Sequence, residues 1–153
     1  YYKALNFLKM EKYEEALVEC RRLNIRLQQL AARYASEEKY KRDAFVHNLM
    51  GIIYQANGDW NNAFIAYRNA LEIYQDDYSN MFGIHPPDQL KHDLLEAAYR
   101  TGFTDEFELF KNQFGWPDYK VNNHDADLVF FWHNGLGPVK DEWSVNFMIN
   151  RSG

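Results

Sequence analysis

The sequence of 153 residues is poor in the features that several classes of protein require. Its one cysteine, Cys20, excludes an internal disulfide and a cysteine-rich zinc site. Its longest conspicuous apolar run, Leu128 to Trp132, has the length of a strand and falls far short of the roughly 20 residues of a membrane-spanning helix. The formal net charge of −5 argues against a general binder of phosphate backbones, which needs a dense face of Lys and Arg.

Signs of catalytic chemistry are also scarce, and we expect neither an enzyme nor a cofactor. The run Gly135-Leu136-Gly137-Pro138 is not a phosphate-binding loop, because no Lys-Ser/Thr follows it and no helix is expected after it. The serines lack the strand-turn-helix context of a nucleophile, and Cys20 falls on an apolar helix face, where a buried, inert thiol is expected.

One cluster in the tail leaves an alternative open, that of a metal-binding or enzymatic module. Imidazole and carboxylate groups are suitable ligands for zinc or another divalent ion. Their spacing here matches no recognised motif, and loops rich in Asn, Asp and His are common turn chemistry. We therefore expect no metal site. The cluster consists of His124, Asp125, Asp127 and His133.

Apolar residues at steps of three and four predict a mainly α-helical fold. A short helix is expected around residues 4–8, and a connection over residues 36–43 ends at Asp43, a plausible N-cap. Gly58 suits the left-handed end of one helix and Asp59 the cap of the next, while Gly83, Pro86 and Pro87 predict a loop over 80–88. The longer helices are predicted at residues 13–34, 44–56, 60–78, 88–101 and 104–114.

The basic group Arg21, Arg22 and Arg26 follows Glu14, Glu15 and Glu19 on one predicted helix. The helix dipole favours acidic residues early and basic residues late, so we interpret this group as helix stabilisation.

The tail changes character after Trp116-Pro117. Residues 128–132 and 145–149 are typical of strands and flank a turn region with Gly135, Gly137 and Pro138, which predicts a β-hairpin packed on the end of the helices. We thus predict a helical domain over residues 1–115 and an extension over 116–153.

The central helix pair carries a repeat pattern. Gly51 and Ala63 are small where two antiparallel helices approach most closely, and Tyr54 and Tyr67 fill the space beside them. Together with Met50, Trp60, Ala70 and Leu71, these positions resemble the tetratricopeptide (TPR) repeat, with His47 and Gln75 departing from its usual Trp and Pro. An upstream copy contains Tyr13, Ala16 and Cys20, and a degenerate downstream copy contains Ala97, Tyr99, Gly102, Phe107 and Phe110.

With the segments Tyr13 to Arg22, Asn57 to Trp60 and Asn134 to Lys140 added, the chain resembles bacterial TPR-containing proteins, mostly uncharacterised, that are often cell-envelope lipoproteins. This resemblance implies a superhelical array of antiparallel helix pairs, and an envelope location is favoured over a cytoplasmic one. The sequence starts at Tyr1 without Met, and we expect both ends to continue in a longer protein, with the lipoprotein's acceptor cysteine before Tyr1.

The TPR resemblance implies an interaction scaffold or adaptor that holds a peptide segment or partner protein in a groove lined by the first helix of each pair. This lining has no basic pair to clamp a C-terminal carboxylate, and in the alternative interpretation the residues only cover a groove that the tail fills. Self-association through the strand at 128–132 is a third possibility. By register, the groove residues are Leu5, Leu8, Asn48, Ile52, Gln55, Asp93, Ala97 and Arg100.

Overall fold

The computed structural model describes residues 1–33 and 42–121, which fall within one compact unit, Tyr1–Asn122. Every regular element in these two ranges is helical, so the mainly α fold class is confirmed, while the predicted hairpin and the His/Asp cluster of the tail lie outside the described residues. The elements are α1 (Tyr2–Lys9), α2 (Tyr13–Arg33), α3 (Ala44–Ala56), α4 (Trp60–Ile73), the π-helix η2 (Tyr74–Tyr78), α5 (Ser79–Phe82), α6 (Asp88–Thr101) and α7 (Thr104–Phe114).

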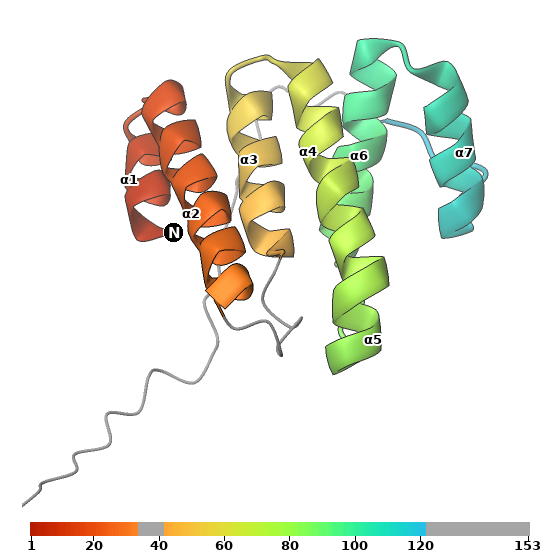
Figure 1. The fold of residues 1–153 in the computed structure, drawn as a ribbon. Coiled ribbons are helices and arrows are strands. Elements are labelled where there is room, and N and C mark those ends of the chain that lie inside the picture. The colour runs from red at the N-terminus through yellow and green to blue at the C-terminus, as the bar shows by residue number, and fades with distance from the viewer. Residues whose placement is uncertain (34–41, 122–153) are drawn as a thin grey trace, which may run out of the picture. The chain divides into compact units, whose positions relative to one another are not determined.

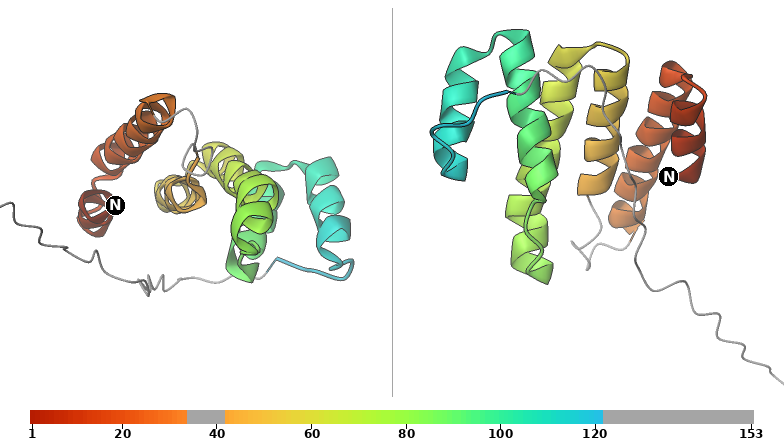
Figure 2. Two further views of the ribbon diagram at one scale, coloured as in Figure 1. Left: turned by 60° about the horizontal axis from the view of Figure 1, so that its bottom comes forward. Right: turned by 180° about the vertical axis from the view of Figure 1, so that it is seen from behind.

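Helices that follow one another in sequence are neighbours in space within this unit (Figures 1 and 2). Helix α3 packs most extensively against α4, and α4 packs in turn against α6. Helix α2 joins α1 to α3, and α7 packs on α6. The helices therefore form a row with α4 near its centre and with α1 and α7 at its two ends.

The main core lies where α4, α6 and α7 meet. Phe64 of α4 packs edge-on against Phe103 and Phe110, with ring centroids 5.2 and 6.2 Å apart. Large side chains that are fully buried fill the space between these helices, which removes apolar surface from water. The buried residues of this core are Ala63, Phe64, Tyr67, Ala70, Leu71, Leu90, Leu94, Leu95, Ala97, Ala98 and Phe110.

Local sequence signals place the helix ends as predicted. The Asp43 side chain accepts from the backbone N–H groups of Phe45 and Val46 and caps α3. Asp59 caps α4 by accepting from the N–H of Asn62, and Gly58 before it takes a left-handed φ of 74°. A left-handed Gly102 likewise ends α6.

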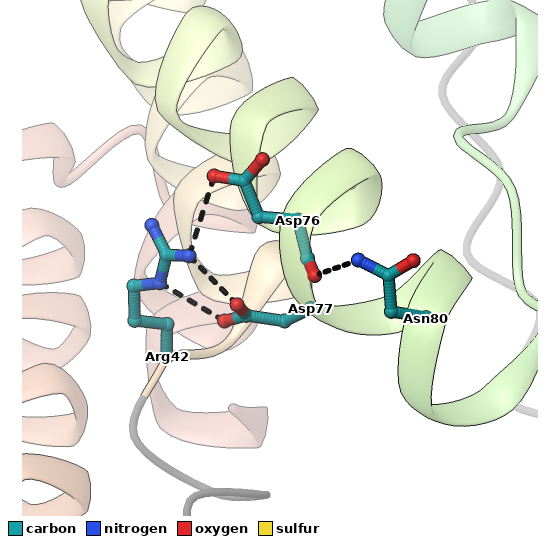
Figure 3. Close-up of polar contacts among 4 residues, drawn as sticks. All are labelled: Arg42, Asp76, Asp77 and Asn80. Carbon is teal, nitrogen blue, oxygen red and sulfur yellow. Dashed lines mark hydrogen bonds and ion pairs between the residues drawn. The ribbon is translucent and has the colours of Figure 1, made fainter.

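The end of α4 differs from the prediction, because residues 80–82, expected in a loop, belong to helix α5. The helix continues through the wider turn of η2, where the Asn80 side chain donates to the Asp76 carbonyl oxygen at 2.7 Å. Arg42 donates two hydrogen bonds to Asp77, at 2.9 and 2.7 Å, and lies 3.6 Å from the Asp76 carboxylate (Figure 3). The helix then ends at Gly83, one of the predicted breakers.

Candidate partner-binding face

The predicted groove residues of α3 form one stripe. Asn48, Ile52 and Gln55 are spaced by four and three residues, so they share one helix face, and all three are half-buried. Ile52 packs against the edge of the main core. The stripe therefore presents two side-chain amides on either side of an apolar residue.

Gln55 is held in place from α4. The ring of Tyr67 is fully buried, and its hydroxyl donates to Gln55 Oε1 at 2.6 Å. This ring fits only because position 51 is glycine, since a Cβ there would lie 2.3 Å from Tyr67 Cε1. Tyr67 thus fills the space beside the small Gly51, as predicted, and its hydroxyl holds the Gln55 side chain.

Asn48 is the least satisfied polar residue of the stripe. Its Oδ1 is buried and has no hydrogen-bond partner among the described residues. A buried acceptor without a donor destabilises a protein by about 1–3 kcal/mol. A turn of the Asn48 amide towards the surface would expose this oxygen to a donor.

Helix α6 contributes a second, charged stripe. Asp93 Oδ1 accepts from Gln89 Nε2, and Glu96 Oε1 accepts from Arg100 Nε, both at 2.8 Å. The Arg100 guanidinium also lies 4.8 Å from the centre of the Trp60 ring at the start of α4. Arg100 is thus a cation that an aromatic ring and a carboxylate hold in a defined position.

Ala97, which the register places between Asp93 and Arg100, is fully buried in the main core. Its small side chain lies beneath the surface and offers no area for direct contact with a partner. Of the other predicted α6 residues, Asp93 is half-buried and Arg100 is exposed.

Leu5 and Leu8 lie on α1 and are half-buried. Helix α1 meets α3 at Tyr1, whose hydroxyl donates to the Asp43 carboxylate and whose ring centroid is 5.4 Å from that of Phe45. Burial and the neighbouring Asp43 raise the pKa of the Tyr1 hydroxyl. This contact joins the residue before α1 to the start of α3 and does not involve Leu5 or Leu8.

Three groups near the two stripes were not predicted as part of the face, namely Trp60, the Tyr67 hydroxyl and Glu96. The repeat pattern assigns Trp60 and Tyr67 to packing, so it gives no sign of their contacts with Arg100 and Gln55.

His47, which stands where the repeat pattern usually has Trp, faces α2, where its Nε2 is 3.5 Å from Asn24 Nδ2. Burial lowers the pKa of His47, so that imidazole favours its neutral form.

Within residues 1–33 and 42–121, no group of three or more His, Cys, Asp or Glu side chains is arranged to hold a metal ion. None of the helices in these two ranges is both long enough and apolar enough to cross a membrane. In comparisons with family models, curated proteins and solved structures, nothing matches this chain. The TPR resemblance therefore rests on the residues quoted above.

Proposed function

We propose that this chain is a TPR-like interaction scaffold that binds a segment of another protein along the face formed by α3 and α6. The buried and unpartnered Asn48 Oδ1 carries the proposal, because it lies on the stripe that the repeat register assigns to the groove. The proposal assigns no reaction to the chain.

The packing of the central helices supports a repeat scaffold. In the proposed repeat, α3 and α6 would be the first helices of successive pairs; both pack against α4. The contact of Gly51 with Tyr67 matches the small-against-large packing of the repeat pattern. A partner lying along α3 and α6 would therefore bind two helices that α4 holds together.

The chemistry of the face suits the backbone of an extended segment. Asn48 offers an acceptor, and Gln55, whose carbonyl oxygen is taken by Tyr67, offers its amide N–H groups. Because Asn48 Oδ1 is buried, a bound segment would reach it only after the amide turns outward. Ile52 between the two amides would contact an apolar side chain of the partner.

Arg100 would supply the charged contact. Its position over Trp60 and beside Glu96 restricts the side chain before binding, which lowers the entropy lost on association. The remaining guanidinium N–H groups would donate to a carboxylate or backbone carbonyl of the partner. The resemblance to envelope lipoproteins would place that partner in a bacterial cell envelope.

An affinity pull-down from a bacterial envelope extract, followed by a titration with the captured protein, tests this proposal. The triple variant Asn48→Ala/Gln55→Ala/Arg100→Ala removes the polar contacts of the face. Asn112→Ala/Gln113→Ala/Lys120→Ala is the control, because it removes an Asn, a Gln and a basic side chain from exposed positions away from α3 and α6. We expect the groove variant to bind at least about tenfold more weakly, given the free energy of two or three hydrogen bonds.

Circular dichroism must show unchanged helicity in both variants. Equal binding by the wild type and the groove variant would reject the α3–α6 face. An equal loss of binding in both triple variants would show a nonspecific effect and would also reject the α3–α6 face.

A further inference from the structure

The two terminal helices of the row carry opposite charge. Helix α1, YKALNFLK, has two lysines and no acidic residue, which gives +2. Helix α7, TDEFELFKNQF, has three acidic residues and one lysine, which gives −2. Helices α1 and α7 lie at opposite ends of the row (Figures 1 and 2). The compact unit therefore has one basic and one acidic terminal helix.

The basic end contains a groove of about 610 Å³. It forms because α2 has 21 residues and α1 only 8, so the second half of α2 extends past the start of α1. Leu23, Ile25 and Leu30 supply apolar lining, and Ile25 and Leu30 are 53% and 44% exposed. An open groove with this much exposed apolar surface is suited to cover by another helix.

Cations dominate the charged lining of this groove, with Lys3, Arg22 and Arg26 against the single carboxylate of Glu19. Glu19 Oε1 accepts from Lys3 at 2.8 Å and from Arg22 at 2.7 Å, and these contacts lower the pKa of Glu19. Arg22 therefore has the helix-stabilising contact expected from the sequence. Three cations and one anion nevertheless leave the lining with a charge of +2.

The acidic end presents a matching helix face. On α7, Phe110 and Lys111 are buried against the unit, while Asp105, Glu108 and Leu109 are exposed, Leu109 by 61%. Positions 105, 108, 109 and 112 are spaced as one stripe of a helix. The stripe thus consists of the exposed Leu109, the carboxylates of Asp105 and Glu108, and the amide of Asn112. Glu108 also accepts from the largely buried Lys111 at 3.1 Å, which leaves its carboxylate at the surface with a cation on its inner side.

We propose that copies of this chain associate head to tail, with the outer stripe of α7 of one copy seated in the α1–α2 groove of the next. Leu109 would cover the apolar floor, and Asp105 and Glu108 would approach Arg22 and Arg26. The contact joins two different surfaces, so it extends the row of helices from copy to copy. Charge attraction between the ends makes the association stronger at low salt.

Sedimentation velocity over a concentration series, at about 20 and about 500 mM NaCl, tests this association on the whole chain. Two charge-reversal variants are required: Arg22→Glu/Arg26→Glu in the groove and Asp105→Lys/Glu108→Lys on α7. The control Glu72→Lys/Asp118→Lys changes the same number of exposed acidic residues away from both surfaces. Circular dichroism checks that all variants remain folded.

The wild type and the control should associate, more strongly at low salt, and each reversal variant alone should associate at least about tenfold more weakly. Mixing the two reversal variants should restore association, because each reversed surface then meets its opposite. A wild type that stays monomeric at every concentration and salt level overturns the proposal. Association that survives both reversals also overturns it and would point to another surface.

Discussion

Among single residues, Gly51 sets how closely α3 can approach α4. A Cβ at this position would lie 2.3 Å from Cε1 and 2.4 Å from Cδ1 of Tyr67. The ring cannot easily withdraw, because it is fully buried and its hydroxyl is bound to Gln55. Gly51→Ala should therefore destabilise the protein by about 1–3 kcal/mol, the usual effect of overpacking. Urea unfolding followed by circular dichroism measures this change.

This expectation has the opposite sign to helix propensity, since replacing a helical glycine by alanine normally stabilises by about 1 kcal/mol. Gly51→Ala/Tyr67→Leu should recover part of the loss, because it makes room for the new methyl group. Gly51→Ala/Tyr67→Phe should not, because it removes only the hydroxyl. A Gly51→Ala variant as stable as the wild type would contradict the close approach.

Cys20 predicts a pH dependence. The thiol is fully buried on α2, and burial raises its pKa to about 11 from an ordinary value of 9.0. The folded state therefore keeps the proton where the unfolded chain has lost it. The resulting stability is fully present below about pH 9 and is lost as the pH rises towards 11.

The difference in unfolding free energy between the wild type and Cys20→Ala isolates this effect from the titration of other groups. That difference should be constant at neutral pH and should shrink in alkaline solution. A difference that stays constant up to pH 11 would show that Cys20 titrates as in the unfolded chain.

At the scale of elements, Asp43 joins α1 to α3, because one carboxylate caps α3 and accepts from the Tyr1 hydroxyl. Asp43→Ala removes both contacts and should destabilise by about 1–2 kcal/mol, as loss of an N-cap does. Asp43→Asn keeps a good capping side chain and should lose much less. Chemical denaturation of the two variants measures both changes, and equal losses would show that capping contributes little.

The helices were predictable because their signals are local. Over residues 44–56, apolar side chains recur at helical spacing between the cap Asp43 and the helix breaker Gly58. Helix α3 accordingly has the predicted bounds. The π-helix η2 was not predicted, and the contacts of its aspartates with Arg42 join residues that are distant in sequence. The loop predicted around Gly83 is present, but it begins after Phe82 and not at residue 80.

The candidate site was predictable only in part, for a similar reason. Register placed Asn48, Ile52 and Gln55 on one half-buried stripe. The same register could not show that Ala97 is fully buried, because burial depends on how tightly α6 packs against α4. The contacts of Arg100 with Trp60 and of Gln55 with Tyr67 join different helices, so spacing within one helix does not contain them.

At the scale of the compact unit, each helix depends mainly on its neighbours in the row. Helix α4 packs against both α3 and α6, whereas α1 packs mainly against α2. The second half of α2 also lines the open groove with exposed apolar side chains. In an array of this kind, stability varies along the row with the number and quality of neighbouring contacts.

Hydrogen exchange measured by mass spectrometry should therefore be slowest in α3, α4 and α6 and faster in α1 and the second half of α2. Leu17→Ala near one end should accelerate exchange in α1 and α2 alone. Leu94→Ala in the main core should accelerate exchange in α4, α6 and α7 together. Both substitutions truncate a fully buried leucine and should lower the free energy of unfolding by about 2–5 kcal/mol, so only their place in the row differs. If both variants instead accelerate exchange equally in every described helix, the row unfolds as one cooperative unit, and the end helices are as firmly held as the centre.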